Sequence, residues 1–530
     1  MATALLCLLI AAQAGQAYDT VVVCPAEFRQ ALAPWVAHRE AQGHRLLTIA
    51  SRATSAELRE DVRQLARQHP LRFLVLVGDA DPLVLEDPSL QALGVPAHFV
   101  PAKVNVRFGS EPYIATDNWY ADLDDDRVPE LAVGRLSADT PAELSGMVAK
   151  ILAYEKCADY GSWRRQVHFV AGLGGFGPVA DAVLEATAKT LITSGIPPAY
   201  NTSMTYGSWQ SPYCPDPRRF DAVTIDRLNE GSLFWVYLGH GQQRSVDRVR
   251  VPTGTYPILD CPDAARLECR HGAPIACFLA CYSGAFDQPR DCLAEEMLRN
   301  PRGPVAILCG TRVTMPYGMA VLGSELLDEC FGRQPETLGE LFVAVKRHTV
   351  HPQTVSRHRA ALDTVGRAFA WAIGSDAEAE RYEHLDLFNL LGDPLLRLPF
   401  PQPVKLAVPA TALPGGALEI TGHSPIAGRC TVELVVRRDR LTFHPPERGQ
   451  FDAQRLAEYE AVYRQANEQR LATLDVGPVN GSFRAPLAVP LTAHGPCHVR
   501  VFIEGAGGCA AGAADVVFDS RTAERPAAPR

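Results

Sequence analysis

The 530-residue sequence contains no apolar run long enough to cross a membrane as a helix and no block of basic residues. Its 51 basic and 60 acidic residues are spread along the chain and give a net charge of −9. A membrane span and nucleic-acid binding are therefore not expected. The G-x-S-x-G turn of many serine hydrolases is also missing, which disfavours that class. Internal repeats are absent.

The first 17 residues contain a short apolar run, from Ala4 to Ala12, followed by small residues. This pattern predicts a signal peptide over residues 1–17, cleaved after Ala14 or Ala17, although the usual Lys or Arg before the run is missing. The alternative is a buried first strand or helix. Fourteen cysteines fit a secreted or periplasmic chain. Removal of Cys7 with the signal peptide leaves an odd number of cysteines. The sequence does not decide whether Cys261 and Cys269 form a loop disulfide.

Short apolar runs alternate with amphipathic stretches from residue 18 to residue 399, which predicts an α/β fold with a parallel sheet. The runs are continuous rather than alternating, as in strands buried on both faces. Thr54 with Glu57, and Thr140 with Glu143, have the spacing of capping boxes and predict two helix starts. Seven strands are expected, over residues 20–24, 45–50, 73–79, 167–171, 233–238, 275–281 and 303–310.

Three prolines, at positions 399, 401 and 403, indicate a linker. Beyond it, alternating short strands predict an immunoglobulin-like β-sandwich over residues 403–519, with a helix inserted near residues 452–470. Residues 520–530 are rich in Pro, Ala and Arg, and a disordered tail is expected there. Before the linker we expect an N-terminal α/β subdomain over residues 18–140 and a second subdomain over residues 141–399.

Ligand sites in open parallel sheets lie beyond the carboxyl ends of strands, and three loops qualify. The first, Gly172 to Gly177, has the letters of a dinucleotide fingerprint. No acidic residue follows about 20 residues later, where the fingerprint requires one. We therefore interpret it as a glycine-rich turn beside the site and expect no cofactor.

The other two loops carry His240, between two glycines, and Cys281. Each follows a predicted buried strand, so the two can be neighbours at one edge of the sheet. An imidazole beside a thiol favours the nucleophilic thiolate and can later protonate a leaving amine. Taken singly, each residue is better explained as a turn histidine or a structural cysteine. Cys277 lies roughly 13 Å back along the same strand face and is expected in the core.

The segments "YLGHG" (237–241) and "ACYSGAF" (280–286) resemble the active-site segments of the gingipain-type cysteine peptidases, family C25. Residues 116–136, 303–312 and 387–398 resemble further segments of that family, in the same order. The resemblance covers roughly residues 20–398. It implies a caspase-like fold, with His240 as general base and acid, Cys281 as nucleophile, and the backbone amides of Gly241 and Cys281 as the oxyanion site.

One position departs from the family pattern. Some members carry an acidic partner for the histidine where this chain has Leu173, so a Cys-His dyad is expected rather than a triad. The expected partners are protein or peptide substrates, acted on by a monomer. The alternative is a catalytically inactive caspase-like scaffold that binds a protein or glycan.

Asp122, Asp124 and Asp126 alternate along one acidic turn, a spacing that suits Ca²⁺, with Asp117 as a possible further ligand. A solvated acidic turn explains the pattern equally well. His348, His351 and His358 share a basic stretch without a cysteine or carboxylate at zinc-like spacing, and surface positions are expected for all three.

Overall fold

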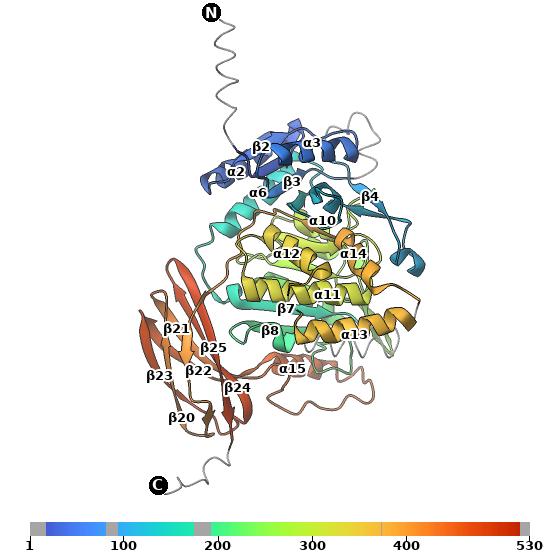
Figure 1. The fold of residues 1–530 in the computed structure, drawn as a ribbon. Helices are drawn as coiled ribbons and strands as arrows, with labels where there is room; N and C mark the ends of the chain where they lie inside the picture. Colours follow the sequence, from blue (N-terminus) through green and yellow to red (C-terminus); the bar gives the residue numbers. More distant parts are fainter. Residues whose placement is uncertain (1–16, 81–93, 174–191, 354, 373, 520–530) are drawn as a thin grey trace, which may run out of the picture.

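The computed structural model describes residues 17–80, 94–173, 192–353, 355–372 and 374–519. The predicted signal peptide, apart from residue 17, and the predicted tail lie outside these ranges. One ten-stranded sheet runs through the α/β part (Figure 1). In spatial order its strands are β2 (Leu46–Ile49), β1 (Thr20–Val23), β3 (Phe73–Val77), β6 (Ala132–Leu136), β16 (Phe388–Leu391), β15 (Ala306–Gly310), β14 (Ile275–Leu279), β9 (Phe234–Leu238), β7 (Gln166–Ala171) and β8 (Asn201–Tyr206).

The predicted α/β fold is confirmed, and the strands of the large sheet pair in parallel at every position but one. Strand β16 pairs parallel with β6 but antiparallel with β15. The five strands from β15 to β8 therefore run opposite to the five from β2 to β16. Both predicted subdomains contribute to this one sheet, and their boundary at residue 140 stays a prediction.

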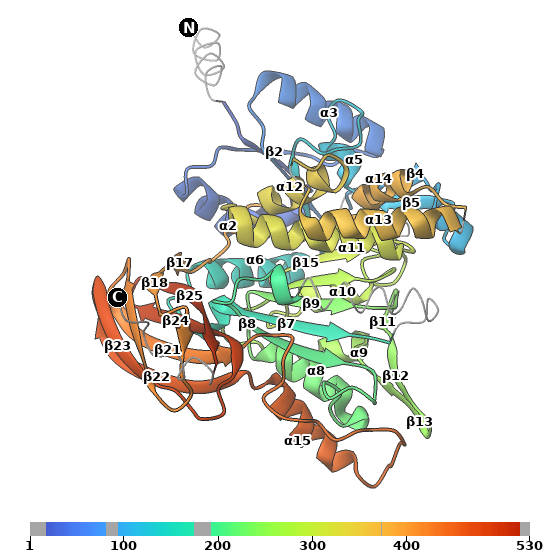
Figure 2. The same ribbon diagram turned by 60° about the horizontal axis from the view of Figure 1, so that its bottom comes forward.

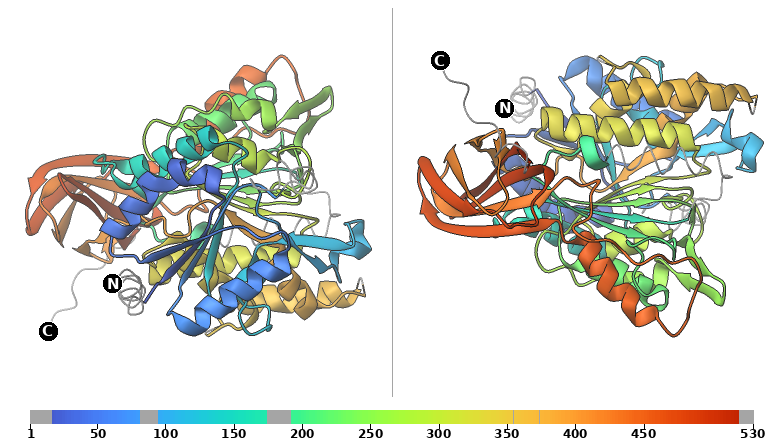
Figure 3. Two further views of the ribbon diagram at one scale, coloured as in Figure 1. Left: turned by 90° about the horizontal axis from the view of Figure 1, so that it is seen from above. Right: turned by 90° about the horizontal axis from the view of Figure 1, so that it is seen from below.

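Helices cover both faces of the sheet, as the continuous apolar strands predict (Figures 2 and 3). In β1, Val22 packs in one core cluster with Trp35 of α2, whereas Val21 and Val23 pack in another with Leu58 of α3. The helices on the face that α2 covers (Figure 3) are α2 (Arg29–Ala41), α6 (Pro141–Glu155), α8 (Phe220–Asn229), α9 (Cys261–Ala264) and α10 (Leu293–Arg299). The helices on the opposite face (Figure 3), which α3 covers, are α3 (Ser55–Gln68), α5 (Asn118–Ala121), α11 (Pro316–Leu327), α12 (Leu338–Val350), α13 (Arg357–Ala372) and α14 (Ala377–Leu387).

The two predicted helix starts are confirmed. The Thr54 side chain accepts a hydrogen bond from the Glu57 amide at the start of α3. Thr140 and Glu143 form a complete capping box at the start of α6. Three short antiparallel hairpins extend from the sheet: β4 (His98–Pro101) with β5 (Tyr113–Thr116), β10 (Gly241–Gln242) with β11 (Ser245–Val246), and β12 (Arg248–Val251) with β13 (Gly254–Pro257).

The C-terminal part forms two further, mainly antiparallel sheets that share one core cluster. Their strands are β17 (Gln402–Pro403), β18 (Lys405–Ala407), β19 (Thr411–Ala412), β20 (Ala417–His423), β21 (Gly428–Val436), β22 (Arg470–Val479), β23 (Ser482–Ala488), β24 (Gly495–Gly505) and β25 (Gly508–Phe518). The predicted inserted helix is α15 (Leu456–Asn467), which lies between β21 and β22 in sequence.

This C-terminal part, hereafter the sandwich, is tied to the large sheet through charged and amide side chains. On α15, the Asn467 side chain accepts from the amide of Met204 and donates to its carbonyl, so it pairs with the edge strand β8. The Arg438 guanidinium donates to four backbone carbonyls between Ile192 and Tyr200. The sandwich therefore fixes the segment that leads into β8.

Within the described part of the chain, no helix is both long and apolar enough to cross a bilayer. The thirteen described cysteines are free thiols, Cys261 and Cys269 among them. The loop disulfide that the sequence left open is therefore not formed in this structure. Cys277 is fully buried in β14, as predicted, and burial raises the pKa of its thiol to about 12.

Candidate active site

The pairing register of two neighbouring strands brings His240 and Cys281 to the same level of the sheet. Strands β9 and β14 are parallel, with Leu238 opposite Leu279. His240 lies two residues beyond Leu238, and Cys281 lies two residues beyond Leu279. The backbone pairing continues past the strands, since the Gly239 amide donates to the Leu279 carbonyl at 3.3 Å. Both candidate residues are partly exposed at this edge.

The loops that carry the two residues touch through Gly241. A Cβ atom on Gly241 would lie 2.3 Å from the Cys281 carbonyl oxygen, 2.9 Å from the Ala280 Cβ and 3.2 Å from the Cys281 nitrogen. Real Cβ atoms do not approach other atoms that closely, so only glycine permits this contact. The glycine after the histidine is therefore required by the approach of the cysteine loop.

The backbone of His240 is held by a buried tyrosine. The Tyr237 hydroxyl donates to the His240 carbonyl at 2.9 Å, and the Asp247 amide donates to the same carbonyl at 3.1 Å. Tyr237 is fully buried, and this burial raises the pKa of its hydroxyl further above the ordinary value. The hydroxyl therefore stays protonated and remains a hydrogen-bond donor to the histidine loop.

Cys281 begins a tight turn whose next residue has an unfavourable backbone conformation. Tyr282 has φ of 55°, in the left-handed region that residues with a side chain rarely adopt. The turn is held because the Tyr282 amide donates to the Arg312 carbonyl and the Gly284 amide donates to the Gly310 carbonyl. Strain of this kind persists only where the surroundings enforce it, and it concentrates at functional sites.

The thiol of Cys281 contacts one residue that the sequence analysis missed. The Thr314 amide donates to Sγ at 3.3 Å, and the Thr314 hydroxyl oxygen lies 3.4 Å from Sγ. Thr314 follows β15, the strand on the other side of β14 from β9. The position of a threonine four residues beyond the strand end gave no sequence signal for this contact.

No acidic residue stands at the predicted position, because Leu173 occupies it. An acidic side chain nevertheless lies near the histidine loop. A Cβ on Gly172 would lie 2.8 Å from the Tyr237 hydroxyl and 3.3 Å from a carboxylate oxygen of Asp247. Asp247 thus sits between the loop after β7 and the loop of His240, which the sequence analysis also missed. Residues 174–177 of the glycine-rich loop lie outside the described residues.

The acidic turn of the calcium prediction is only partly assembled. Ligand atoms of Asp122, Asp124 and Glu130 lie within 4.8 Å of one another. Asp117 instead forms a two-pronged ion pair with the buried Arg135, and the Asp126 carboxylate accepts the Val128 amide.

A guanidinium already stands at this turn, since Arg59 lies 3.3 Å from a carboxylate oxygen of Asp122. The residues therefore fit a cation in part: Asp122 and Asp124 come together with Glu130, and Asp117 and Asp126 make other contacts. Calcium binding stays a prediction.

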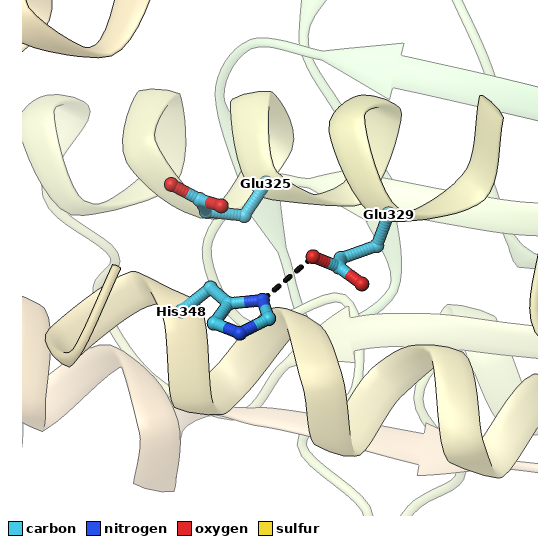
Figure 4. A group of neighbouring side chains, drawn as sticks. All are labelled: Glu325, Glu329 and His348. Carbon is cyan, nitrogen blue, oxygen red and sulfur yellow. Dashed lines mark hydrogen bonds and ion pairs between the residues drawn. The ribbon is translucent and has the colours of Figure 1, made fainter. Parts of the chain in front are cut away.

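A second group of possible metal ligands lies in the helical layer (Figure 4). Glu325, Glu329 and His348 are all buried, and His348 Nδ1 lies 2.6 Å from a Glu329 carboxylate oxygen. The expectation that His348 is a surface residue is wrong, because its side of α12 packs against the helix that carries the two glutamates.

The surroundings of this group are those of an ion-pair network. Arg359 pairs with Glu325, and among the described residues nothing hydrogen-bonds to His348 Nε2. A metal bound at Nδ1 would leave that nitrogen without the outer partner that metal-bound histidines need. The side chain of His358 lies outside the described residues.

The fold is that of the gingipain cysteine proteinases. The crystal structure of the Arg-specific cysteine proteinase gingipain R matches with a TM-score of 0.54 at 17% identity, over 95% of this chain and 98% of that one. A complex of the pro- and mature domains of a Porphyromonas gingivalis gingipain R matches with a TM-score of 0.53 at 16% identity, over 94% and 100%.

The family model described as peptidase family C25 matches residues 13–399. The chain therefore belongs to peptidase family C25. Lys-gingipain of Porphyromonas gingivalis is 24% identical over 336 residues, which are 61% of this chain and 17% of that protein. Lys-gingipain W83 of the same species is 24% identical over 341 residues, with the same shares. The chain thus aligns with about a sixth of the length of these relatives.

Proposed function

We propose that the protein is an extracytoplasmic cysteine endopeptidase in which Cys281 is the nucleophile and His240 is the general base and acid. One observation carries the proposal: two in-register strands lead into the loops that carry these two residues, and the loops touch at Gly241. Membership of family C25 supports the reaction class. Both residues come from one chain, so we also propose that a monomer is the active unit, which size-exclusion chromatography tests.

In the proposed mechanism, the imidazole of His240 takes the thiol proton, and the sulfur of Cys281 attacks the carbonyl carbon of the scissile peptide bond. The carbonyl oxygen becomes an oxyanion, for which we propose the backbone amides of Gly241 and Cys281 as donors. The imidazolium then gives its proton to the leaving amine as the C–N bond breaks. Water, deprotonated by His240, hydrolyses the resulting thioester and restores the thiol.

The test is cleavage of a peptide library by purified protein and by Cys281→Ala and His240→Ala. We expect cleavage by the wild type and none above background by either variant, with unchanged circular dichroism. Cys157→Ala is the matched control, because Cys157 is the other described cysteine that is not buried. Equal cleavage by Cys281→Ala would refute the assignment. A wild type that neither cleaves peptides nor reacts with iodoacetamide at Cys281 would instead support an inactive scaffold.

A further inference from the structure

The sulfur of Cys281 lies against both polar donors of one buried residue. Thr314 is 1% exposed, and its amide nitrogen, hydroxyl oxygen and carbonyl oxygen lie 3.3, 3.4 and 3.7 Å from Sγ, the carbonyl as an acceptor for the neutral thiol. The hydroxyl also lies 2.9 Å from the sulfur of Met319, a weak acceptor. The same hydroxyl therefore has two sulfur atoms within reach.

The backbone of Thr314 is fixed from several sides. The Asn105 side chain donates to the Val313 carbonyl at 3.0 Å, and the Met315 amide donates to His384 Nε2 at 3.1 Å. A Cβ on Gly310 would lie 2.8 Å from the Thr314 methyl group, so the start of this loop is closely packed. The amide that faces Sγ is thus preorganised, and α11 begins two residues later with Pro316 at its first position.

The amide and hydroxyl contacts favour a negatively charged sulfur, whereas the Thr314 carbonyl, 3.7 Å from Sγ, accepts only from the neutral thiol. A thiolate accepts hydrogen bonds better than a thiol does, and bonds to an ionised acceptor are about twice as strong as neutral ones. When the thiol proton leaves for the imidazole or for solvent, the amide already points at Sγ and the hydroxyl can turn from Met319 to join it. Both donors stabilise the ionised state of the nucleophile more than its neutral state.

We propose that Thr314 is a third catalytic residue, which stabilises the thiolate of Cys281 through its amide and its hydroxyl. This inference rests on the proposed function of Cys281 as nucleophile. It does not replace the histidine, which still transfers the proton.

The test compares Thr314→Val, which keeps the shape but removes the hydroxyl, with Thr314→Ser, which keeps the hydroxyl. The rate of iodoacetamide alkylation at Cys281 is measured by peptide mass spectrometry from pH 5 to pH 10. For Thr314→Val we expect the pH of half-maximal rate to rise by about one unit, and the rate at neutral pH to fall about tenfold. Thr314→Ser should restore the wild-type profile.

A second variant covers the case in which Thr314→Val does not fold. Met319→Leu conserves volume and removes the competing sulfur acceptor. It should raise the alkylation rate at neutral pH by on the order of twofold, since the hydroxyl is then free to donate to Sγ. No increase in this variant would overturn the inference.

Three results with Thr314→Val would also contradict it: a profile that superimposes on the wild type, the same fractional loss at every pH, or faster alkylation. A superimposed profile would mean that the hydroxyl does not stabilise the thiolate. An equal loss at every pH would mean that the residue has only a structural role. Faster alkylation would mean that Thr314 lowers the reactivity of the sulfur. In each case the wild type would still cleave peptides. Failure of the proposed function differs, because the wild type itself would then neither cleave nor react.

Discussion

Replacing Gly241 with alanine should separate the His240 and Cys281 loops without unfolding the protein. The new methyl group would lie 2.3 Å from the Cys281 carbonyl oxygen and 2.9 Å from the Ala280 Cβ. Ordinary contact begins near 3.5 Å, so the loops must move apart by about 1 Å. A displacement of that size in a catalytic pair costs about 10²-fold in rate. Overpacking of this kind costs about 1–3 kcal/mol of stability.

Gly254→Ala is the matched control for this change. Gly254 begins β13 at the turn of the β12–β13 hairpin, and a Cβ there meets nothing within 4 Å. The assay is kcat/KM on a cleaved library peptide, with thermal unfolding of each variant. We expect a loss of about 10²-fold for Gly241→Ala and none for Gly254→Ala. Equal activity of the two variants would refute the claim that contact at Gly241 sets the geometry.

Three further predictions concern groups around the site. Tyr237→Phe removes the donor to the His240 carbonyl and should lower stability by about 1–3 kcal/mol and reduce kcat; unchanged unfolding and kcat would show that the hydroxyl does not hold the loop. Burial and the nearby Glu295 raise the pKa of Asp79 to about 7, so the folded state keeps a proton that the unfolded state releases. Stability should then fall by about 1 kcal/mol between pH 6 and pH 8, and Asp79→Asn should flatten this dependence; a wild type with no loss over that range contradicts the reasoning. Arg438→Met leaves four carbonyls without their donor and should lower the unfolding midpoint in urea, whereas an unchanged midpoint would show that the sandwich does not brace this segment.

Features set by neighbouring residues in the sequence could be predicted. The helix starts at Thr54 and Thr140 depend on a side chain and an amide three residues apart. The continuous apolar runs predicted strands that are buried on both faces of the sheet. The direction of β16 could not be predicted, because its apolar residues are the same whichever way it pairs, and only the path of the distant chain decides.

At the candidate site too, local features could be predicted and contacts between distant segments could not. The closeness of the His240 and Cys281 loops could be predicted, because each loop follows its own buried strand and family segments surround both. Thr314 and Asp247 could not, since their contacts come from chain segments that meet only in the fold. The pairing of Asp117 with Arg135 could not be predicted for a related reason, because Arg135 lies inside a buried strand where the pattern predicts no charge.

The central claim is that Cys281 forms the covalent intermediate with the help of His240. The direct measurement is mass spectrometry of the protein after reaction with a peptide acyloxymethyl ketone, followed by mapping of the modified peptide. The account predicts one adduct, on Cys281, formed by the wild type and by Cys157→Ala and greatly slowed in His240→Ala. An adduct on another cysteine, or peptide cleavage that continues in Cys281→Ala, would contradict it.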